Sequence, residues 1–406
     1  MKKMKILILN STLDSGSTGR LCSQLQAFLE ERNVDVFRAY SVGKKINSIK
    51  YYKIGNLFDR KTHALLSRMT GNQLNFSFIA TFRFLKYVKD INPNIIFINN
   101  IHANYINFKL LFSYLRRKKI HTVITFHDCW FYTGKCCYYT IAECNKWKNK
   151  CEHCPQLNTE RGFYLFDRTS YMQKVKKQYL LNIEDLNIIC VSNWLANEAR
   201  NSFLTRNNSI RVIYNWIDLN TFTIKENKII RNKRFENKKV ILSVASSWTE
   251  RKGLDKIISV SKLSSDEYIF VIIGKTNKTI SNNKVFHVPN VSNVKELVYY
   301  YNLADVFLNL SLEETFGLVT AEALACGTPV VALDSTATSE LITKRTGFLL
   351  PPTATSKQIF NTINSIKKKK YSFECRKFAE QHFNFKKNCN QYLELFETIV
   401  KEKSGV

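Results

Sequence analysis

The stretch that decides the fold runs from Leu310 to Leu333 and reads L-S-L-E-E-T-F-G-L-V-T-A-E-A-L-A-C-G-T-P-V-V-A-L. Gly327 and Pro329 cannot continue a helix, and the apolar run at 330–333 that follows them is typical of a buried strand. The stretch therefore predicts a loop, a short helix, a turn and a strand, in that order.

Two glutamates, Glu314 and Glu322, lie eight positions apart in this stretch. On one continuous helix, eight steps of ~100° leave two side chains about 80° apart, so such a helix does not align the carboxylates. We therefore expect Glu314 in the loop before the helix and Glu322 inside it. The backbone N–H groups of Phe316, Gly317 and Leu318 then lie at a helix N-terminus, which favours an anion such as a phosphate.

Short β-rich runs alternate with longer amphipathic stretches, which indicates an α/β fold of parallel sheets covered by helices. The runs are found at 6–9, 95–98, 122–126, 188–191, 211–214, 239–245, 268–273, 306–310 and 329–333. Because the pattern restarts after a polar, charged segment at 223–238, we predict two doubly wound, Rossmann-like domains facing a central cleft. Ligands of such sheets bind beyond the carboxyl ends of the strands.

The predicted boundaries divide the chain into three parts. Residues 1–222 form the N-terminal domain, including a cysteine-rich loop at 129–154, and residues 223–385 form the C-terminal domain. Residues 386–406 form a helix that packs back toward the N-terminal domain.

The composition limits the possible functions. The chain has 406 residues and is 45% hydrophobic, which is enough for two domain cores. No apolar run approaches the ~18 residues that span a bilayer, and the run at 6–9 is too short for a signal peptide, so we expect a cytoplasmic protein. The net charge of +28 is explained mainly by solvated lysines, and the alternative is attraction to a nucleotide diphosphate, an anionic membrane face or a nucleic acid.

Residues 109–119 combine an apolar side with four consecutive cations at 116–119. A helix lying on an anionic membrane has this pattern, and so does a core-packed helix with a basic end. We favour core packing for the apolar side and leave the basic end open to lipid. This reading allows a peripheral location at the inner face of the cytoplasmic membrane.

His102 and His127 each follow a strand run, which predicts that both lie at the edge of the cleft. A lone histidine usually has a structural role. His127 is the stronger functional candidate because it precedes Asp128, and a neighbouring carboxylate can orient and tune an imidazole.

Two further loops follow strands and are suited to bind an anion. The loop at 10–20 contains Gly19, which allows close backbone approach, although an ordinary strand-to-helix loop is an equally good interpretation. Arg251 and Lys252 precede Gly253, and such a cationic pair can hold a diphosphate by charge-assisted contacts. No D-x-D pair occurs in the chain, so we expect no metal or other cofactor to be required for catalysis.

The loop at 129–154 is rich in cysteine. Its six cysteines are Cys129, Cys136, Cys137, Cys144, Cys151 and Cys154. Cys151 and Cys154 form a two-residue-spaced pair, and Cys136 and Cys144 would complete a four-thiolate structural zinc site. The alternative is a loop of reduced cysteines packed with Trp130, Trp147 and Tyr138. In both cases, a long insertion directly after His127 predicts a binding loop.

With these pieces in place, the sequence resembles the glycosyltransferase family 4 group of GT-B enzymes. The matching segments are G-S-T-G-R, T-F-H-D, V-S-N-W-L-A, I-Y-N-W-I-D, R-K-G-L-D, V-I-I-G and the block from Leu303 to Phe348. The H-D-C-W loop is similar to the branch of that family that builds bacterial polysaccharides, the colanic-acid-type transferases. The resemblance implies that residues 1–222 form the acceptor side and residues 223–385 bind the nucleotide sugar.

The resemblance also implies roles for single residues of the C-terminal domain. Glu314 corresponds to the motif glutamate near the donor sugar and the reacting centre, and Glu322 to the one that accepts hydrogen bonds from the ribose hydroxyls. Lys252 matches the lysine that clamps the donor diphosphate, and Arg251 lies beside it. The backbone from Phe316 to Leu318 would bind the sugar-phosphate end of the donor.

In the N-terminal domain, the resemblance implies that Gly19 approaches the donor from across the cleft and that His127 orients or stabilises the transferred sugar. Two positions depart from the family pattern. Ser247 stands where many members have an arginine, so Arg251 must substitute for it. Trp216 stands where the family usually has the glycine of N-G-I-D.

We therefore expect a retaining transfer of a hexose-type sugar from a nucleotide diphosphate donor to a hydroxyl of a growing, lipid-linked glycan. One alternative is a GT-B enzyme that modifies a nucleotide sugar, such as an epimerase. The other is a basic nucleic-acid-binding protein, which we disfavour because the sequence contains no recognisable nucleic-acid module and its basic residues are dispersed.

Overall fold

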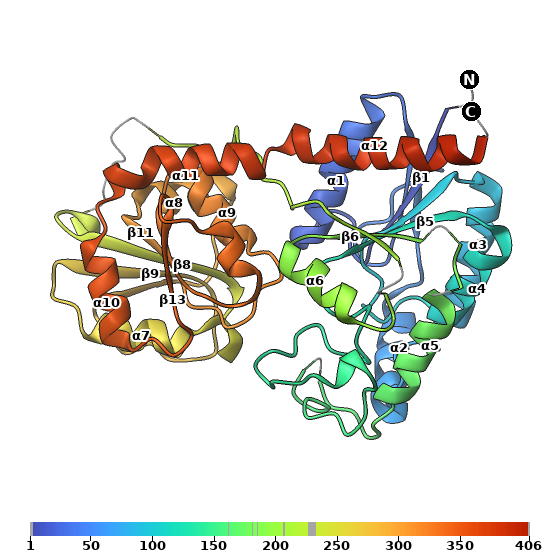
Figure 1. Ribbon diagram of the computed structural model, residues 1–406, viewed down its shortest axis with the longest axis horizontal. Coiled ribbons are helices and arrows are strands. Elements are labelled where there is room, and N and C mark those ends of the chain that lie inside the picture. The colour runs from blue at the N-terminus through green and yellow to red at the C-terminus, as the bar shows by residue number, and fades with distance from the viewer. Residues whose placement is uncertain are drawn as a thin grey trace. The chain divides into compact units, whose positions relative to one another are not determined.

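The computed structural model of the chain (Figure 1) describes residues 3–160, 162–180, 182–184, 186–205, 208–225 and 233–404. The chain divides into two compact units, which we describe separately. The first unit comprises Met1–Ile213 together with Cys389–Val406, and the second comprises Tyr214–Asn388. The chain thus passes between the units at 213/214 and 388/389, whereas the sequence suggested 222/223 and 385/386. Residues 226–232 of the segment at 223–238 lie outside the described part.

In the first unit, the described residues form a parallel seven-stranded sheet of order β3-β2-β1-β4-β5-β6-β7, with helices on both sides (Figure 1). The strands are β1 (Lys5–Leu9), β2 (Asp35–Tyr40), β3 (Tyr51–Lys53), β4 (Ile95–Ile98), β5 (His121–Phe126), β6 (Leu186–Cys190) and β7 (Ser209–Val212). The helices are α1 (Gly16–Glu30), α2 (Leu57–Thr70), α3 (Phe78–Ile91), α4 (Phe108–Lys118), α5 (Thr169–Leu180) and α6 (Asn193–Asn201). The chain runs outward from β1 to β3 and returns to β4, so the topological switch point lies between β1 and β4.

In the second unit, the described residues form a parallel six-stranded sheet of order β10-β9-β8-β11-β12-β13. The strands are β8 (Lys239–Ser247), β9 (Tyr268–Lys275), β10 (Val285–Val288), β11 (Val306–Asn309), β12 (Val330–Leu333) and β13 (Gly347–Leu350). The helices are α7 (Leu254–Lys262), α8 (Val294–Leu303), α9 (Leu318–Ala325), α10 (Ser356–Ser365), α11 (Lys368–His382) and α12 (Phe385–Ser404), the last of which continues into the first unit. Here the switch point lies between β8 and β11, which pair directly with Val306 opposite Ile241.

The stretch 310–333 adopts the predicted order of loop, helix, turn and strand. Glu314 lies in the loop before α9 and Glu322 lies inside α9, which confirms the expectation for both residues. The helix begins after Gly317, whose φ of 95° is unfavourable for other residues, and the turn after it contains Gly327 with a φ of 72°. Both glycines are therefore required by the backbone of this stretch.

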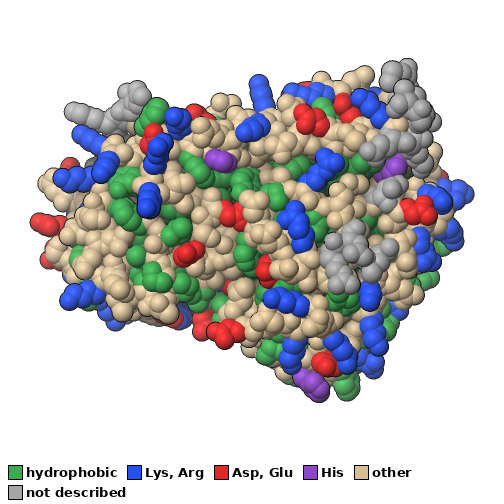
Figure 2. All heavy atoms as spheres, in the orientation of Figure 1, with side chains coloured by type: hydrophobic (Ala, Val, Ile, Leu, Met, Phe, Trp, Pro, Cys, Tyr) green, Lys and Arg blue, Asp and Glu red, His purple; other side chains and the backbone are tan. Residues whose placement is uncertain are grey.

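Helix α4 packs its apolar side into the core, as predicted. Phe108, Leu111 and Phe112 are at most 2% exposed, while the four cations at 116–119 are exposed. Figure 2 shows Lys and Arg side chains spread over the face that it draws, with Asp and Glu between them. Among the described residues, no helix combines the length and the hydrophobicity that a membrane span requires.

The C-terminal helix α12 contributes to the core of the first unit. The Tyr392 and Phe396 rings lie 5.5 and 5.6 Å from the ring of Phe97 in β4. The Tyr392 hydroxyl lies 3.4 Å from Thr125 Oγ1 in β5. Aromatic pairs at such distances stabilise a core beyond the area that they bury, so the sheet of the first unit depends on residues from the end of the chain.

Two glycines with the same φ angle provide a test of loop packing in the second unit. Gly16 and Gly253 both have a φ of +72°, but a Cβ at Gly16 would meet nothing within 4 Å, whereas a Cβ at Gly253 would lie 2.3 Å from the Leu310 carbonyl oxygen. Gly16→Ala therefore costs only the ~1 kcal/mol of a left-handed backbone. Gly253→Ala must in addition displace a backbone carbonyl. We expect Gly253→Ala to lower the calorimetric unfolding temperature by a few degrees more than Gly16→Ala, and equal shifts would contradict the close packing of this loop.

Candidate active site

The centre of the candidate site is an ion pair at the switch point of the second sheet. Lys252 lies at the end of the loop that follows β8, and Glu314 lies in the loop that follows β11. The Lys252 ammonium forms an ion pair with Glu314 Oε1, and both side chains are largely buried, with 19% and 9% of their areas exposed. Because β8 and β11 are adjacent parallel strands, their carboxyl ends bring these two loops together.

The side-chain hydroxyl of Thr336 fixes the backbone of Glu314. The Glu314 N–H donates to Thr336 Oγ1 at 2.8 Å, and that hydroxyl donates back to the Glu314 carbonyl at 2.7 Å. Burial raises the pKa of the Glu314 carboxyl, but Lys252, Arg251 and a hydrogen bond from Ser311 outweigh this effect and hold that pKa below its ordinary value. The carboxyl is therefore ionised at neutral pH.

Arg251 also joins the loop after β8 to the loop after β11. Its guanidinium Nη1 donates to the Glu313 carbonyl at 2.9 Å, and its own carbonyl accepts the Leu312 N–H at 2.9 Å. The structure therefore brings Arg251, Lys252 and Glu314 together, as predicted. Two cations, Arg251 and Lys252, thus lie beside the Glu314 carboxylate at this point of the second unit.

Helix α9 begins at Leu318, four residues after Glu314. Thr320 and Ala321 donate their N–H groups to the Gly317 carbonyl, and no side chain caps the helix. For Phe316, Gly317 and Leu318, no protein acceptor of the N–H group is found within the described ranges. These three groups are the donors that a helix N-terminus offers to an anion. The Phe316 ring is buried and packs 5.6 Å from Phe383.

Glu322 faces the interior of the second unit. It is 5% exposed, and its Oε2 accepts a hydrogen bond of 2.8 Å from the Tyr301 hydroxyl in α8. The hydroxyl thus fixes one carboxylate oxygen of Glu322. Tyr301 has no distinguishing signal in the sequence, where it is the last of three consecutive tyrosines.

The switch point of the first sheet carries a chain of neutral hydrogen bonds. Asn10 follows β1 and donates through Nδ2 to the Thr12 carbonyl at 2.8 Å. Asn99 follows β4 and donates through Nδ2 to Asn10 Oδ1 at 3.1 Å. The remaining oxygen, Asn99 Oδ1, lies 2.8 Å from His127 Nε2. Because this oxygen can only accept, Nε2 of His127 carries the proton.

The pKa of His127 reflects its enclosed position after β5. Removal from water lowers the pKa of His127 to about 4, and this effect outweighs the opposing influence of Asp128. The imidazole is therefore neutral at physiological pH, with Nδ1 as its acceptor nitrogen.

His102 makes the contact with the Asp128 carboxylate that the sequence led us to look for at His127. Asp128 Oδ2 lies 2.9 Å from His102 Nε2, and the His102 ring lies 5.3 Å from that of Trp130. The Cys137 sulfur lies nearby, so that His102, Asp128 and Cys137 have ligand atoms within 4.8 Å of one another. The pairing of His102 with Asp128 was not predicted, because the two residues lie 26 positions apart in the sequence.

Gly19 is an interior residue of α1 and packs within its own unit. A Cβ at this position would lie 2.8 Å from Thr12 Oγ1 and 3.0 Å from the Asp14 carbonyl carbon. The lack of a side chain therefore allows α1 to lie against the loop after β1. The predicted approach of Gly19 and His127 to a donor held by the second unit remains a prediction.

Four cysteines of the predicted zinc site line one small cavity of the first unit. These are Cys136, Cys144, Cys151 and Cys154. The expected aromatic packing of the loop is also present, since Trp147 is 1% exposed and its ring lies 5.1 Å from that of Tyr132. Both interpretations of this loop remain predictions.

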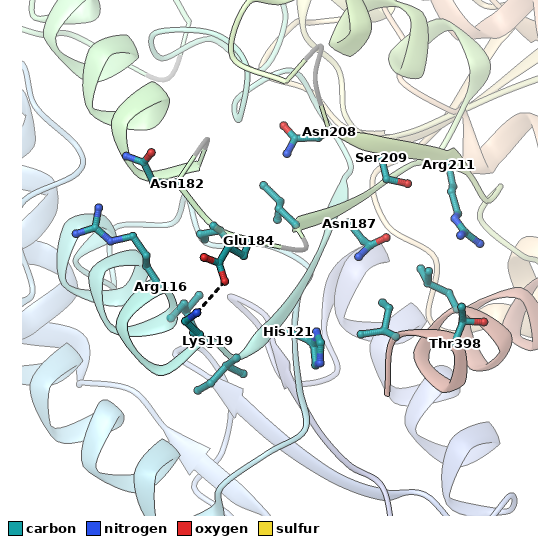
Figure 3. A pocket seen from close by; sticks show the side chains of 16 residues that line it. Arg116, Lys119, His121, Asn182, Glu184, Asn187, Asn208, Ser209, Arg211 and Thr398 are labelled. Carbon is teal, nitrogen blue, oxygen red and sulfur yellow. Dashed lines mark ion pairs between the residues drawn. The ribbon is translucent and has the colours of Figure 1, made fainter. Parts of the chain in front are cut away.

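A wide hollow of the first unit lies away from these residues. It has a volume of about 830 Å³ and is bordered by α4, α12 and the amino ends of β5, β6 and β7 (Figure 3). Lys119 and Glu184 form an ion pair of 3.2 Å at its rim. His127 follows the carboxyl end of β5, at the opposite edge of the sheet, so this hollow is not part of the candidate site.

Comparison with known proteins identifies both halves of the chain. Residues 51–221 match the family model of Glycosyltransferase Family 4, and residues 224–385 match that of Glycosyl transferases group 1. The chain is a glycosyltransferase. The family matches therefore support neither of the two alternative functions considered for the sequence, a nucleotide-sugar epimerase and a nucleic-acid-binding protein.

Similar proteins support the assignment. The enzyme is 24% identical over 358 residues to WcaC of Escherichia coli K12, described as a colanic acid biosynthesis glycosyl transferase, covering 85% of this chain and 86% of WcaC. Among solved structures, it resembles sucrose-phosphate synthase of Thermosynechococcus elongatus, with a TM-score of 0.72, 16% identity and coverage of 98% and 100% of the two chains. It also resembles Anabaena HepE in complex with UDP-glucose, with a TM-score of 0.66, 16% identity and coverage of 97% and 100%. The glycosyltransferase therefore has the GT-B fold.

The two departures from the family pattern have different surroundings. Ser247 ends β8 and is exposed, while Arg251 supplies the cation beside Lys252. Trp216 is 4% exposed and packs 6.1 Å from the Phe385 ring. The indole thus fills the core of the second unit at the place where the family has a glycine.

We expect the His127 imidazole to remain neutral well below pH 6. The folded-state pKa of about 4 lies below the ~6.5 of an unfolded histidine, so the stability that this residue contributes is present above pH 6.5 and is lost as the pH falls toward 4. Imidazole resonances of the glycosyltransferase, followed by NMR and assigned with His127→Asn, should show a titration midpoint near 4. A midpoint near 6.5 would contradict the enclosed, neutral histidine.

Proposed function

We propose that the enzyme transfers a hexose-type sugar, with retention, from a nucleoside diphosphate sugar to a hydroxyl of a growing, lipid-linked bacterial surface glycan. The observation that carries the proposal is the Lys252–Glu314 ion pair, with Arg251, at the switch point of the second sheet. The name of WcaC supports a polysaccharide acceptor, and the UDP-glucose bound by HepE supports a nucleotide-sugar donor.

The second unit supplies the charge for donor binding. When the bond between the sugar and the diphosphate breaks, negative charge develops on the leaving phosphate, and fixed positive groups stabilise it. Lys252, Arg251 and the N–H groups at the start of α9 are such groups, and they come from the two loops of one switch point. On this proposal, Glu322 accepts hydrogen bonds from the ribose, while its other oxygen is fixed by Tyr301.

Glu314 acts mainly through Lys252. Its carboxylate is 9% exposed and already paired, so it is better suited to hold the ammonium in place than to attack the sugar. Without Glu314, the Lys252 side chain would lose its partner and a fixed direction. We therefore assign Glu314 as a positioning residue and Lys252 as a group that contacts the donor.

The proposed reaction is a same-face exchange at the anomeric carbon. The bond from this carbon to the diphosphate oxygen breaks, and a bond to the acceptor hydroxyl oxygen forms on the same face. The acceptor proton passes to the leaving phosphate, which departs as part of the nucleoside diphosphate. Neutral His127 is suited to hydrogen-bond with a sugar hydroxyl through Nδ1, because its Nε2 proton is held by Asn99.

Replacing either member of the buried ion pair should reduce turnover strongly. Lys252→Ala removes the enzyme's cation that would stabilise the leaving diphosphate, and we expect kcat to fall roughly 100-fold or more. Glu314→Gln should lower kcat to a similar extent, since the neutral amide cannot form an ion pair with the Lys252 ammonium. Lys278→Ala is a matched control, because Lys278 forms an exposed ion pair with Asp255 in the same unit. Turnover is measured as nucleoside diphosphate release from a panel of nucleotide sugars, and near-normal rates in either buried variant would overturn the proposal.

An exposed apolar surface of the first unit supports a lipid-linked acceptor. We call it the α2–α3 apolar surface, and its large side chains, all about half exposed or more, are Leu57, Phe58, Leu65, Met69, Phe78, Ile79, Phe82, Phe163, Leu165 and Phe166. These side chains come from α2, α3 and residues 163–166. The three segments are neighbours, because His63 Nδ1 of α2 lies 2.7 Å from Ser77 Oγ, directly before α3, and the Leu165 N–H donates to the Arg68 carbonyl of α2 at 2.9 Å. Such large exposed apolar areas mark interaction sites.

The charge of this surface fits an anionic lipid. Helices α2 and α3 carry cations at Arg60, Lys61, Arg68, Arg83, Lys86 and Lys89, against Asp59 and Asp90. Apolar side chains with flanking cations are typical of segments that lie in the interface of an anionic membrane. We therefore propose peripheral binding to the membrane that holds the lipid-linked acceptor.

The double variant Phe58→Glu/Ile79→Glu should weaken binding to phosphatidylglycerol-containing vesicles at least tenfold, because each side chain contributes ~1.5–3 kcal/mol when it leaves water. Phe373→Glu is the control, since Phe373 is 71% exposed in the second unit, close to the 76% of Phe58. Vesicle co-sedimentation measures the change. Equal binding of the two variants, or no preference of the enzyme for anionic over neutral vesicles, would contradict this surface.

A further inference from the structure

The cysteine loop contains a cavity of the size of a single ion. Cys136, Cys144, Cys151 and Cys154 line a space of about 20 Å³, and a space of ~10–15 Å³ is enough for one water-sized body. The proposed transfer reaction uses none of these cysteines. The cavity therefore calls for a separate explanation, which is independent of the proposed function.

Amide groups surround the sulfurs. The Gly134 N–H donates to Cys151 Sγ at 3.3 Å, and the Gln156 side-chain amide donates to Cys136 Sγ at 3.7 Å. The Gln156 backbone N–H also donates to Cys154, which is hydrogen-bonded to Cys136. Sulfur is a weak acceptor as a neutral thiol and a strong one as a thiolate, and ligands of a metal are regularly supported in this way by second partners.

A buried cation lies beside the cluster. Lys176 of α5 is 0% exposed, and its ammonium donates to three neutral carbonyl oxygens, those of Trp130, Thr133 and Gly134. The ionisable groups that face it are Cys151, Cys137, Cys136 and Asp128. A buried ammonium costs several kcal/mol unless an opposite charge is near. Asp128 supplies one such charge, and four thiolates around a divalent ion, which carry two negative charges in excess, would add to it.

We propose that Cys136, Cys144, Cys151 and Cys154 bind one zinc ion, which fixes the loop between β5 and α5. Tetrahedral zinc with four thiolates has Zn–S distances of ~2.3 Å, so the sulfurs must draw closer together than they are here. Among the described residues, only His102, Asp128 and Cys137 have ligand atoms all within 4.8 Å of one another. In that trio, however, Asp128 is already paired with His102, and cysteine thiolates are the preferred ligands of a structural zinc site.

Metal analysis of the full chain tests the proposal and separates the two clusters. The enzyme purified from zinc-containing medium should carry about one zinc per chain, measured by plasma mass spectrometry. Cys151→Ser/Cys154→Ser should lose the zinc. Cys137→Ser should retain the zinc, because Cys137 is next to Cys136 in the sequence but belongs to the cluster with His102 and Asp128.

Two further measurements keep the proposal testable where a variant fails to fold. Cys144→His should retain zinc, because histidine replaces cysteine in tetrahedral zinc sites, whereas Cys144→Ser should not. The wild-type chain reconstituted with cobalt should show thiolate-to-cobalt charge-transfer absorption. The proposal is overturned by a wild-type chain without zinc and without these bands. It is also overturned by zinc that persists in Cys151→Ser/Cys154→Ser, or by zinc that is lost only in Cys137→Ser.

Discussion

A buried ion pair between Lys252 and Glu314 joins the two loops that form the candidate site in the second unit of this glycosyltransferase. The pair is possible because adjacent parallel strands, β8 and β11, release their loops at the same edge of the sheet. Burying two charges is favourable only when geometry and hydrogen bonds are good. Thr336 fixes the backbone of Glu314 through its N–H and carbonyl, and Gly253 lets the two loops approach closely, so that the carboxylate meets the ammonium.

The two units use their switch points for different chemistry. In the second unit, the switch point holds charged groups, among them the cations Arg251 and Lys252. In the first unit, it holds the neutral chain Asn10–Asn99–His127, which is anchored at a backbone carbonyl and fixes the tautomer of the histidine. Neutral donors and acceptors suit the hydroxyl groups of sugars. The same architecture thus carries charged groups at one switch point and neutral groups at the other, and the difference lies in the residues that follow the strands.

The sequence predicted those features that local patterns determine. The spacing of Glu314 and Glu322 predicted a loop and a helix, and the apolar runs predicted the central strands of both sheets. Strand β2 was not expected, because Arg38 interrupts its apolar pattern; the structure buries this arginine, which donates to Gln26 Oε1 at 3.1 Å. Pairings over long sequence separations also carry no local signal, as with Thr336 and Glu314, Tyr301 and Glu322, or His102 and Asp128. The division into compact units differs by several residues from the predicted boundaries, because the polar segment at 223–238 has the composition of a linker although the contacts of Tyr214 already belong to the second unit.

Helix α12 has a consequence for the order in which the protein is made. The second unit is continuous in sequence, from Tyr214 to Asn388, whereas the first unit is completed by Cys389–Val406. A chain that leaves the ribosome from its N-terminus folds unit by unit. The sheet of the first unit must therefore wait, with the surface around Phe97 and Thr125 uncovered, until Tyr392 and Phe396 emerge. The unit whose synthesis begins first is thus the last to finish folding, and a chain truncated before α12 would leave it incomplete.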